Sequence, residues 1–266
     1  VIFHRPFYAL DLTLDVNYGH DWIEGYYEPG HTIWITVTGS DGSTVKGVAE
    51  MTTDYPPNWD QPGFATWWTG WLGDQPNLVP YDWVHVKADN GATNAVQVGE
   101  IDFGVDYGAD LVSGNLYAPW VLAPLVDLEC AIWSESGGPS LTGMVDPDGG
   151  AIYCDYGSIP WNIQPGETVA VSYWDEDGDR IINTVDWPQI TVNIGPWSGG
   201  DRQVWGNGAP PNSSVDVTVS DEFGAFLEGT VAPTDEWGNF DTGEALSEGI
   251  LAFWNIVEVD FGNGIT

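Results

Sequence analysis

The chain has 266 residues, 42% of them hydrophobic, and its five lysines and arginines face 40 aspartates and glutamates, giving a formal net charge of −35. This composition allows two or three small domains with real cores and excludes a disordered chain. The charge repels nucleic acid and anionic lipid, so neither is expected as a partner, and no apolar run has the length of a membrane-spanning helix.

High glycine and proline contents, 34 and 18 residues, favour an all-β chain of short strands and turns. The first ten residues, VIFHRPFYAL, form an apolar segment outside the repeats that follow. An alternating apolar strand then starts at Leu12 and recurs at Ile101 and Ile190, an even spacing of 89 residues. Three such units are typical of tandem immunoglobulin-like β-sandwiches. The predicted divisions are 1–10, 11–100, 101–188 and 189–266, and the lack of Gly/Ser linkers predicts a rod.

The second strand of each unit carries its apolar residues on one face, by the two-residue period of a strand. The residues expected in the core are Ile33, Ile35 and Val37, then Val126, Leu128 and Cys130, then Val215, Val217 and Val219. Each unit closes with a hairpin, but the third hairpin begins at Val257-Glu-Val259 and has no returning strand before Thr266. The third unit is therefore predicted to lack its last strand.

The two cysteines, Cys130 and Cys154, lie on predicted core faces of the second unit. Neither belongs to a CxxC pattern and no histidine is near, so a disulfide is favoured over a metal site. A disulfide implies an oxidising compartment, and a loop of this length contributes roughly 3 kcal/mol of stability on the chain-entropy model.

Two motifs, Pro165-Gly-Glu-Thr-Val-Ala-Val171 and Asp235-Glu-Trp-Gly-Asn-Phe-Asp241, resemble the strand entry and the turn of tandem immunoglobulin-like repeats in bacterial secreted and cell-surface proteins. The resemblance covers about residues 11–266. It implies a sandwich fold, an extracellular or cell-surface location, and an adhesive, stalk or fibre role. The Trp-rich insertion 56–74 in the first unit departs from the repeat pattern.

The missing last strand suggests the first functional hypothesis. An apolar strand from one copy could complete the third unit of the next copy, building a head-to-tail filament in which the chain's partners are copies of itself. The residues proposed for this assembly are Val1, Ile2, Phe3, Phe7, Tyr8 and Leu10, with Val257, Val259, Phe261 and Ile265. The alternatives are that residues 1–10 fold back onto the first unit, or that the natural chain continues beyond Thr266.

A second hypothesis is carbohydrate binding or adhesion, because flat indole rings stack on sugar rings and exposed aromatic patches mark interaction sites. The candidate residues in the first unit are Trp34, Trp59, Trp67, Trp68 and Trp71, and the partner would be a polysaccharide. The alternative is that these tryptophans are packed in a core.

No catalytic signature is present: the sequence has no G-x-S-x-G elbow, no H-E-x-x-H helix and no free cysteine. A non-enzymatic protein is therefore predicted, and a secreted glycosidase, which needs two converging carboxylates, is the third interpretation. No cofactor is predicted. A weak calcium site stays an alternative to solvated turns at Asp146 and Asp148, or at Asp175, Asp177 and Asp179.

Overall fold

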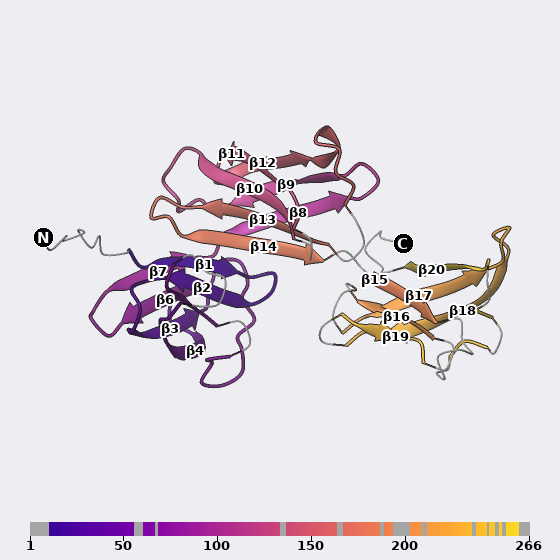
Figure 1. The fold of residues 1–266 in the computed structure, drawn as a ribbon, viewed down its shortest axis with the longest axis horizontal. Helices are drawn as coiled ribbons and strands as arrows, with labels where there is room; N and C mark the ends of the chain where they lie inside the picture. The colour runs from indigo at the N-terminus through magenta and orange to yellow at the C-terminus, as the bar shows by residue number, and fades with distance from the viewer. Residues whose placement is uncertain are drawn as a thin grey trace, which may run out of the picture. The chain divides into compact units, whose positions relative to one another are not determined.

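The computed structural model describes the chain from Asp11 to Asp260 with gaps, namely residues 11–55, 61–66, 69–133, 137–163, 167–186, 189–193, 203–207, 209, 212–235, 238–243, 245–247, 250–251 and 254–260. Within these ranges the fold is all-β, as predicted, and the one helical element is a 3-10 turn, Tyr156–Ser158. Figure 1 numbers the strands in chain order. No helix of the described residues is long and apolar enough to cross a lipid bilayer.

The chain divides into two compact bodies. The N-terminal body comprises residues up to Ile163 together with Thr168–Val185, and the C-terminal body comprises mainly Asp186 and the residues after it. The predicted units 11–100 and 101–188, called the first and second repeats below, thus lie largely in one body. The third repeat, 189–266, lies in the other. The exact division at residues 100 and 188 stays a prediction.

The strands of the first repeat pair antiparallel with one another, and β3 (Thr32–Thr38) shows the alternation of buried and exposed side chains most clearly. In β3, the side chains of Ile33, Ile35 and Val37 are buried and that of Trp34 is exposed, which confirms the predicted alternation. This strand lies in a four-stranded sheet with the order β4-β3-β6-β7. The other strands of the repeat are β1 (Thr13–Asn17), β2 (Trp22–Tyr26), β4 (Val45–Thr52), β5 (Gly63–Ala65), β6 (Trp83–Ala88) and β7 (Thr93–Gln97).

The second repeat contains a three-stranded sheet, β12-β9-β8, and the strands β11-β10-β13-β14. Cys130 on β10 and Cys154 on β12 are buried and form a disulfide that joins these two layers. The predicted disulfide is confirmed. The strands are β8 (Glu100–Asp106), β9 (Leu111–Tyr117), β10 (Val126–Trp133), β11 (Ser140–Val145), β12 (Asp148–Asp155), β13 (Thr168–Trp174) and β14 (Arg180–Asp186).

The first and second repeats have the same kind of turn after their first strand. Asp21 and Asp110, 89 positions apart, both have the left-handed backbone conformation, with φ of 57° and 52°. Aspartate tolerates this conformation better than most residues, because its short side chain can hydrogen-bond locally. Here each carboxylate accepts a hydrogen bond from a distant backbone amide, that of Leu78 at 2.7 Å and that of Ile163 at 2.9 Å. The sequence period therefore corresponds to a structural repeat.

The two repeats of the N-terminal body share one sheet. Strand β1 pairs in parallel with β14, with Asp15 opposite Arg180 and Asn17 opposite Ile182. The result is a seven-stranded sheet with the order β11-β10-β13-β14-β1-β2-β5. Figure 1 shows β14 and β1 side by side at the junction. The repeats are therefore joined by backbone hydrogen bonds and not merely by the connecting chain.

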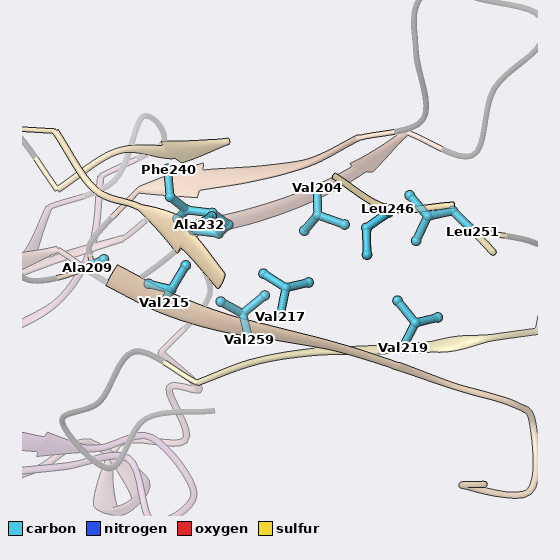
Figure 2. Packing of buried hydrophobic residues seen from close by; sticks show 10 residues of the cluster. All are labelled: Val204, Ala209, Val215, Val217, Val219, Ala232, Phe240, Leu246, Leu251 and Val259. Carbon is cyan, nitrogen blue, oxygen red and sulfur yellow. The ribbon is translucent and has the colours of Figure 1, made fainter. Parts of the chain in front are cut away.

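The third repeat has two three-stranded sheets, β15-β16-β19 and β18-β17-β20. Val215, Val217 and Val219 of β17 are buried, as predicted, and point toward the other layer in Figure 2. The apolar cluster between the layers consists of Val204, Ala209, Val215, Val217, Val219, Ala232, Phe240, Leu246, Leu251 and Val259. The strands are β15 (Gln189–Asn193), β16 (Gln203–Asn207), β17 (Ser214–Ser220), β18 (Phe226–Pro233), β19 (Phe240–Asp241) and β20 (Ile256–Asp260).

Candidate functional site

The first candidate is the outer edge of β20 in the C-terminal body. The corresponding strands of the first two repeats, β6 and β13, each have a further neighbour, β7 and β14. In the part of the chain that the structure describes, the sheet β18-β17-β20 has no strand beyond β20. An edge strand of this kind presents unpaired N–H and C=O groups and is a template for pairing with another strand.

The β20 edge lies beside the core of its body. Val259, opposite Val217 in the register, is fully buried, and Val257, opposite Val219, packs partly buried against the same cluster. Glu258 and Asp260 are exposed, as the alternation of a strand requires. A strand added here would therefore gain backbone hydrogen bonds next to an apolar layer, with carboxylates on the outer face.

Of the ten residues predicted for assembly, the structure describes the two on β20. Val257 and Val259 both belong to the inner face, as the hypothesis requires. The others lie outside the described residues, namely Val1, Ile2, Phe3, Phe7, Tyr8, Leu10, Phe261 and Ile265.

The second candidate is the outer face of the sheet β4-β3-β6-β7, centred on Trp34. Paired residues on neighbouring strands project from the same face, so the register places four side chains in one row. The row runs from Glu50 through Trp34 and Lys87 to Thr93. The indole is 36% exposed, and its Nε1–H donates to Glu50 Oε2 at 3.0 Å. This hydrogen bond fixes the orientation of an aromatic ring that faces solvent.

An open groove of about 640 Å³ follows this row. It is lined by Trp34, Thr36, His85, Val86, Lys87, Thr93, Asn94, Ala95 and Asp177. The imidazole of His85 stacks on Trp83, with ring centroids 5.8 Å apart and planes 12° apart. The groove therefore combines an aromatic platform with hydrogen-bond donors and acceptors, the usual composition of a small-molecule site.

Lys87 is unusual among the described cations of this acidic chain. Lys46 pairs with Asp82 and Arg180 with Glu129. For Lys87, by contrast, no ion pair is formed with any described residue. Its ammonium group is exposed in the groove and can donate hydrogen bonds to a ligand.

The Trp-rich insertion has a different role where the structure describes it. Glu50 N donates to Gly70 O at 3.1 Å and Leu72 N to Val48 O at 2.8 Å, so this segment covers the outer edge of β4. Trp71 forms a bridge with Ala49, which is buried. The Nε1 of Trp71 is buried and has no hydrogen-bond partner among the described residues. Trp71 therefore lies on the opposite face of the sheet from Trp34. The remaining predicted tryptophans, Trp59, Trp67 and Trp68, lie outside the described residues.

The two acidic loops considered for calcium form hydrogen-bonded turns. Asp175 Oδ1 accepts from the amides of Asp177 and Asp179, both at 3.0 Å, and Asp146 Oδ1 accepts from the amide of Asp148 at 2.9 Å. These contacts are those of turns in which aspartate mimics a backbone carbonyl. Across the described ranges, no group of three or more His, Cys, Asp or Glu residues is arranged to hold a metal ion.

Asp179 has a structural role that the sequence did not indicate. Its carboxylate is buried and accepts from Leu14 N at 2.8 Å and from Asn94 Nδ2 at 2.8 and 3.0 Å. One aspartate of the second repeat thus holds β1 and β7 of the first repeat. Burial raises the pKa of Asp179 to about 6, against the opposing effect of the Leu14 amide.

Comparisons with known proteins give no family. No protein-family model and no curated protein matches the chain. Solved structures to which it is similar include a tetra-tandem repeat in the extending region of a large adhesion protein (18% identity, 91% of this chain and 67% of that chain, TM-score 0.23). Another is a structure concerning host cell surface retention of a bacterial ice-binding adhesin, with 12% identity, 88% of this chain and 86% of that chain covered, and a TM-score of 0.21. A third is the BSP domain of a biofilm-associated protein, with 14% identity, 66% of this chain and 29% of that chain covered, and a TM-score of 0.23. TM-scores of this size do not establish a common fold or function.

Proposed function

We propose that the chain is a non-enzymatic structural protein of the cell exterior, whose copies assemble head-to-tail into a fibre or surface layer by β-strand addition. The observation that carries the proposal is the edge of β20, where the described sheet ends one strand earlier than the sheets containing β6 and β13. The disulfide between Cys130 and Cys154 supports an oxidising, extracellular environment.

The proposed occupant of the edge is the segment 1–10 of a second copy. Its sequence, VIFHRPFYAL, has seven apolar residues apart from its proline, and it carries Arg5 and His4 in a chain with a net charge of −35. Glu258 and Asp260 are exposed on one face of β20, so a donor strand whose Arg5 projects from that face meets carboxylates on the acceptor. Opposite charges on neighbouring strands favour pairing and help to set its register.

This contact is heterologous, because the donor segment and the acceptor edge are different surfaces of the same chain. A heterologous contact that does not close into a ring produces an open filament. Deleting residues 1–10 should therefore abolish polymerisation, and a synthetic peptide of residues 1–10 added in excess should cap growth. Polymers that persist after the deletion, with unchanged mass, would refute the assignment of the donor.

A charge reversal on the acceptor provides a finer test. Glu258→Lys should weaken assembly several-fold, because it removes an attraction to Arg5 and adds a repulsion. Glu222→Lys is the matched control, since Glu222 is exposed on the turn between β17 and β18 and the change in net charge is identical. Equal effects of the two substitutions on the sedimentation profile would mean that the edge of β20 is not the contact.

Carbohydrate binding through the Trp34 face is the second candidate function. The specific observation is the exposed indole held by Glu50 in a groove that also offers Lys87, Thr93 and Asp177. Trp34→Ala should weaken retention of the protein on an immobilised polysaccharide several-fold without lowering its thermal unfolding temperature, and retention equal to that of the wild type would refute this candidate.

A glycosidase has less support from the same groove. Hydrolysis of a glycosidic bond needs two carboxyl groups facing each other across the substrate. Among the described lining residues Asp177 is the single carboxylate.

A further inference from the structure

We propose that the C-terminal body carries a binding site for an uncharged glycan on the outer face of the sheet β15-β16-β19, centred on Trp205. The sequence comparison of the repeats did not indicate this site, and it is independent of strand addition at β20.

The register places Trp205 in the middle of a cross-strand row. Thr191 of β15 lies opposite Trp205 of β16, and Trp205 lies opposite Asp241 of β19. Val204, the preceding residue, is fully buried in the core, so the alternation directs the indole outward, where it is 38% exposed. A hydroxyl and a carboxylate therefore stand on either side of an exposed aromatic ring.

The row borders an open groove of about 330 Å³. Its lining consists of Thr191, Trp205, Gly206, Asn207, Asn239, Phe240 and Asp241. This volume is at the lower end of the range of small-molecule sites, about 300–1,000 Å³.

The lining chemistry matches a sugar. The apolar face of a pyranose ring can stack on an indole, while Thr, Asn and Asp side chains together donate to and accept from sugar hydroxyls. Asp241 Oδ1 already accepts from the amide of Gly243 at 2.7 Å, which holds this carboxylate in place. An aromatic platform with fixed polar neighbours provides orientation as well as affinity.

Charge selects an uncharged glycan over an acidic one. The described residues of the C-terminal body include no lysine or arginine, and the whole chain has a net charge of −35. A uronate or sulfate group in the groove would meet Asp241, and the described residues of this body offer no lysine or arginine to pair with it, so its binding is costly. Neutral hydroxyls carry no such penalty.

The Trp34 face of the N-terminal body has the same arrangement. There too an outward indole lies in a cross-strand row beside a carboxylate, that of Glu50. An outward indole beside a carboxylate in a cross-strand row therefore occurs on two sheets of this chain. Binding at Trp205 can be measured separately when Trp34 is removed.

The test uses the full chain carrying Trp34→Ala, titrated calorimetrically with three uncharged probes, cellohexaose, maltohexaose and mannohexaose, and with oligogalacturonate as the acidic probe. At least one uncharged probe should bind, and oligogalacturonate should bind at least tenfold more weakly. Adding Trp205→Ala should weaken the binding at least fivefold. Adding Trp254→Ala should leave it unchanged, because Trp254 is 84% exposed in the same body but does not line the groove.

Three results would overturn the proposal. They are no binding of any uncharged probe at millimolar concentration, equal losses in the Trp205 and Trp254 variants, or tighter binding of oligogalacturonate. Circular dichroism of each variant checks that the sheet is intact. Because the proposal does not involve β20, its failure leaves the assembly model standing, and a monomeric chain that binds cellohexaose would support this site alone.

Discussion

The buried carboxylate of Asp179 allows a test of how the two repeats of the N-terminal body are held together. We consider the substitution Asp179→Asn. The asparagine keeps the size of the side chain but cannot ionise. It also has one oxygen acceptor in place of the two carboxylate oxygens that accept hydrogen bonds from Leu14 N and Asn94 Nδ2. The wild-type protein and this variant therefore differ mainly in one titrating group.

The sign of the pH dependence follows from the raised pKa. Burial raises the pKa of Asp179 from 3.8 to about 6, so between these pH values the folded state binds more protons than the unfolded state. The free energy of unfolding of the wild type therefore falls as pH rises through this window. Each pKa unit corresponds to about 1.4 kcal/mol, so the contribution of Asp179 is at most about 3 kcal/mol.

Urea unfolding of both proteins between pH 4 and pH 7 measures this effect. All other groups titrate in both proteins, so the difference in free energy of unfolding isolates Asp179. The stability of the variant relative to the wild type should rise by about 1–3 kcal/mol from pH 4 to pH 7. A pH-independent difference between the Asp179 variant and the wild type would refute the reasoning.

Further predictions concern the packing of the N-terminal body. Replacing Cys130 and Cys154 by serine should lower the free energy of unfolding by about 3 kcal/mol, because the unfolded chain regains a loop of 24 residues, and chemical denaturation of the double variant checks this. Gly114→Ala should destabilise by about 1–3 kcal/mol, because a Cβ there would collide with the carbonyl oxygen of Asp102. Gly143→Ala is the control in calorimetry, since nothing lies within 4 Å of its Cβ position, and equal melting temperatures of the two glycine variants would contradict the close approach at Gly114.

The features that sequence could predict are those encoded in local patterns. The alternation of Ile33, Trp34 and Ile35 predicted which side chains are buried, and the structure confirms it. The disulfide was predictable because the repeat alignment placed Cys130 and Cys154 on inner faces of one unit. Both inferences depend on the two-residue period of a strand, which any strand packed on one face must show.

The features that sequence could not predict depend on contacts between distant segments. The parallel pairing of β1 with β14 joins residues such as Asp15 and Arg180, and no local pattern marks which edge strands will meet. Asp179 belonged to a loop that matched a solvated turn, yet it is buried against Leu14, 165 positions away. Trp34 and Trp71 also have different environments, which composition does not predict. Trp34 faces solvent, while Trp71 pairs with a buried residue at a sheet edge.

The central claim, assembly through the edge of β20, is tested most directly by the molar mass of the purified chain. Light scattering over a hundredfold range of concentration, with electron microscopy of the same samples, gives both the mass and the form of any assembly. Strand addition predicts a mass that rises with concentration and unbranched filaments in the images. A chain that stays a monodisperse monomer of 28.9 kDa at every concentration would contradict the account.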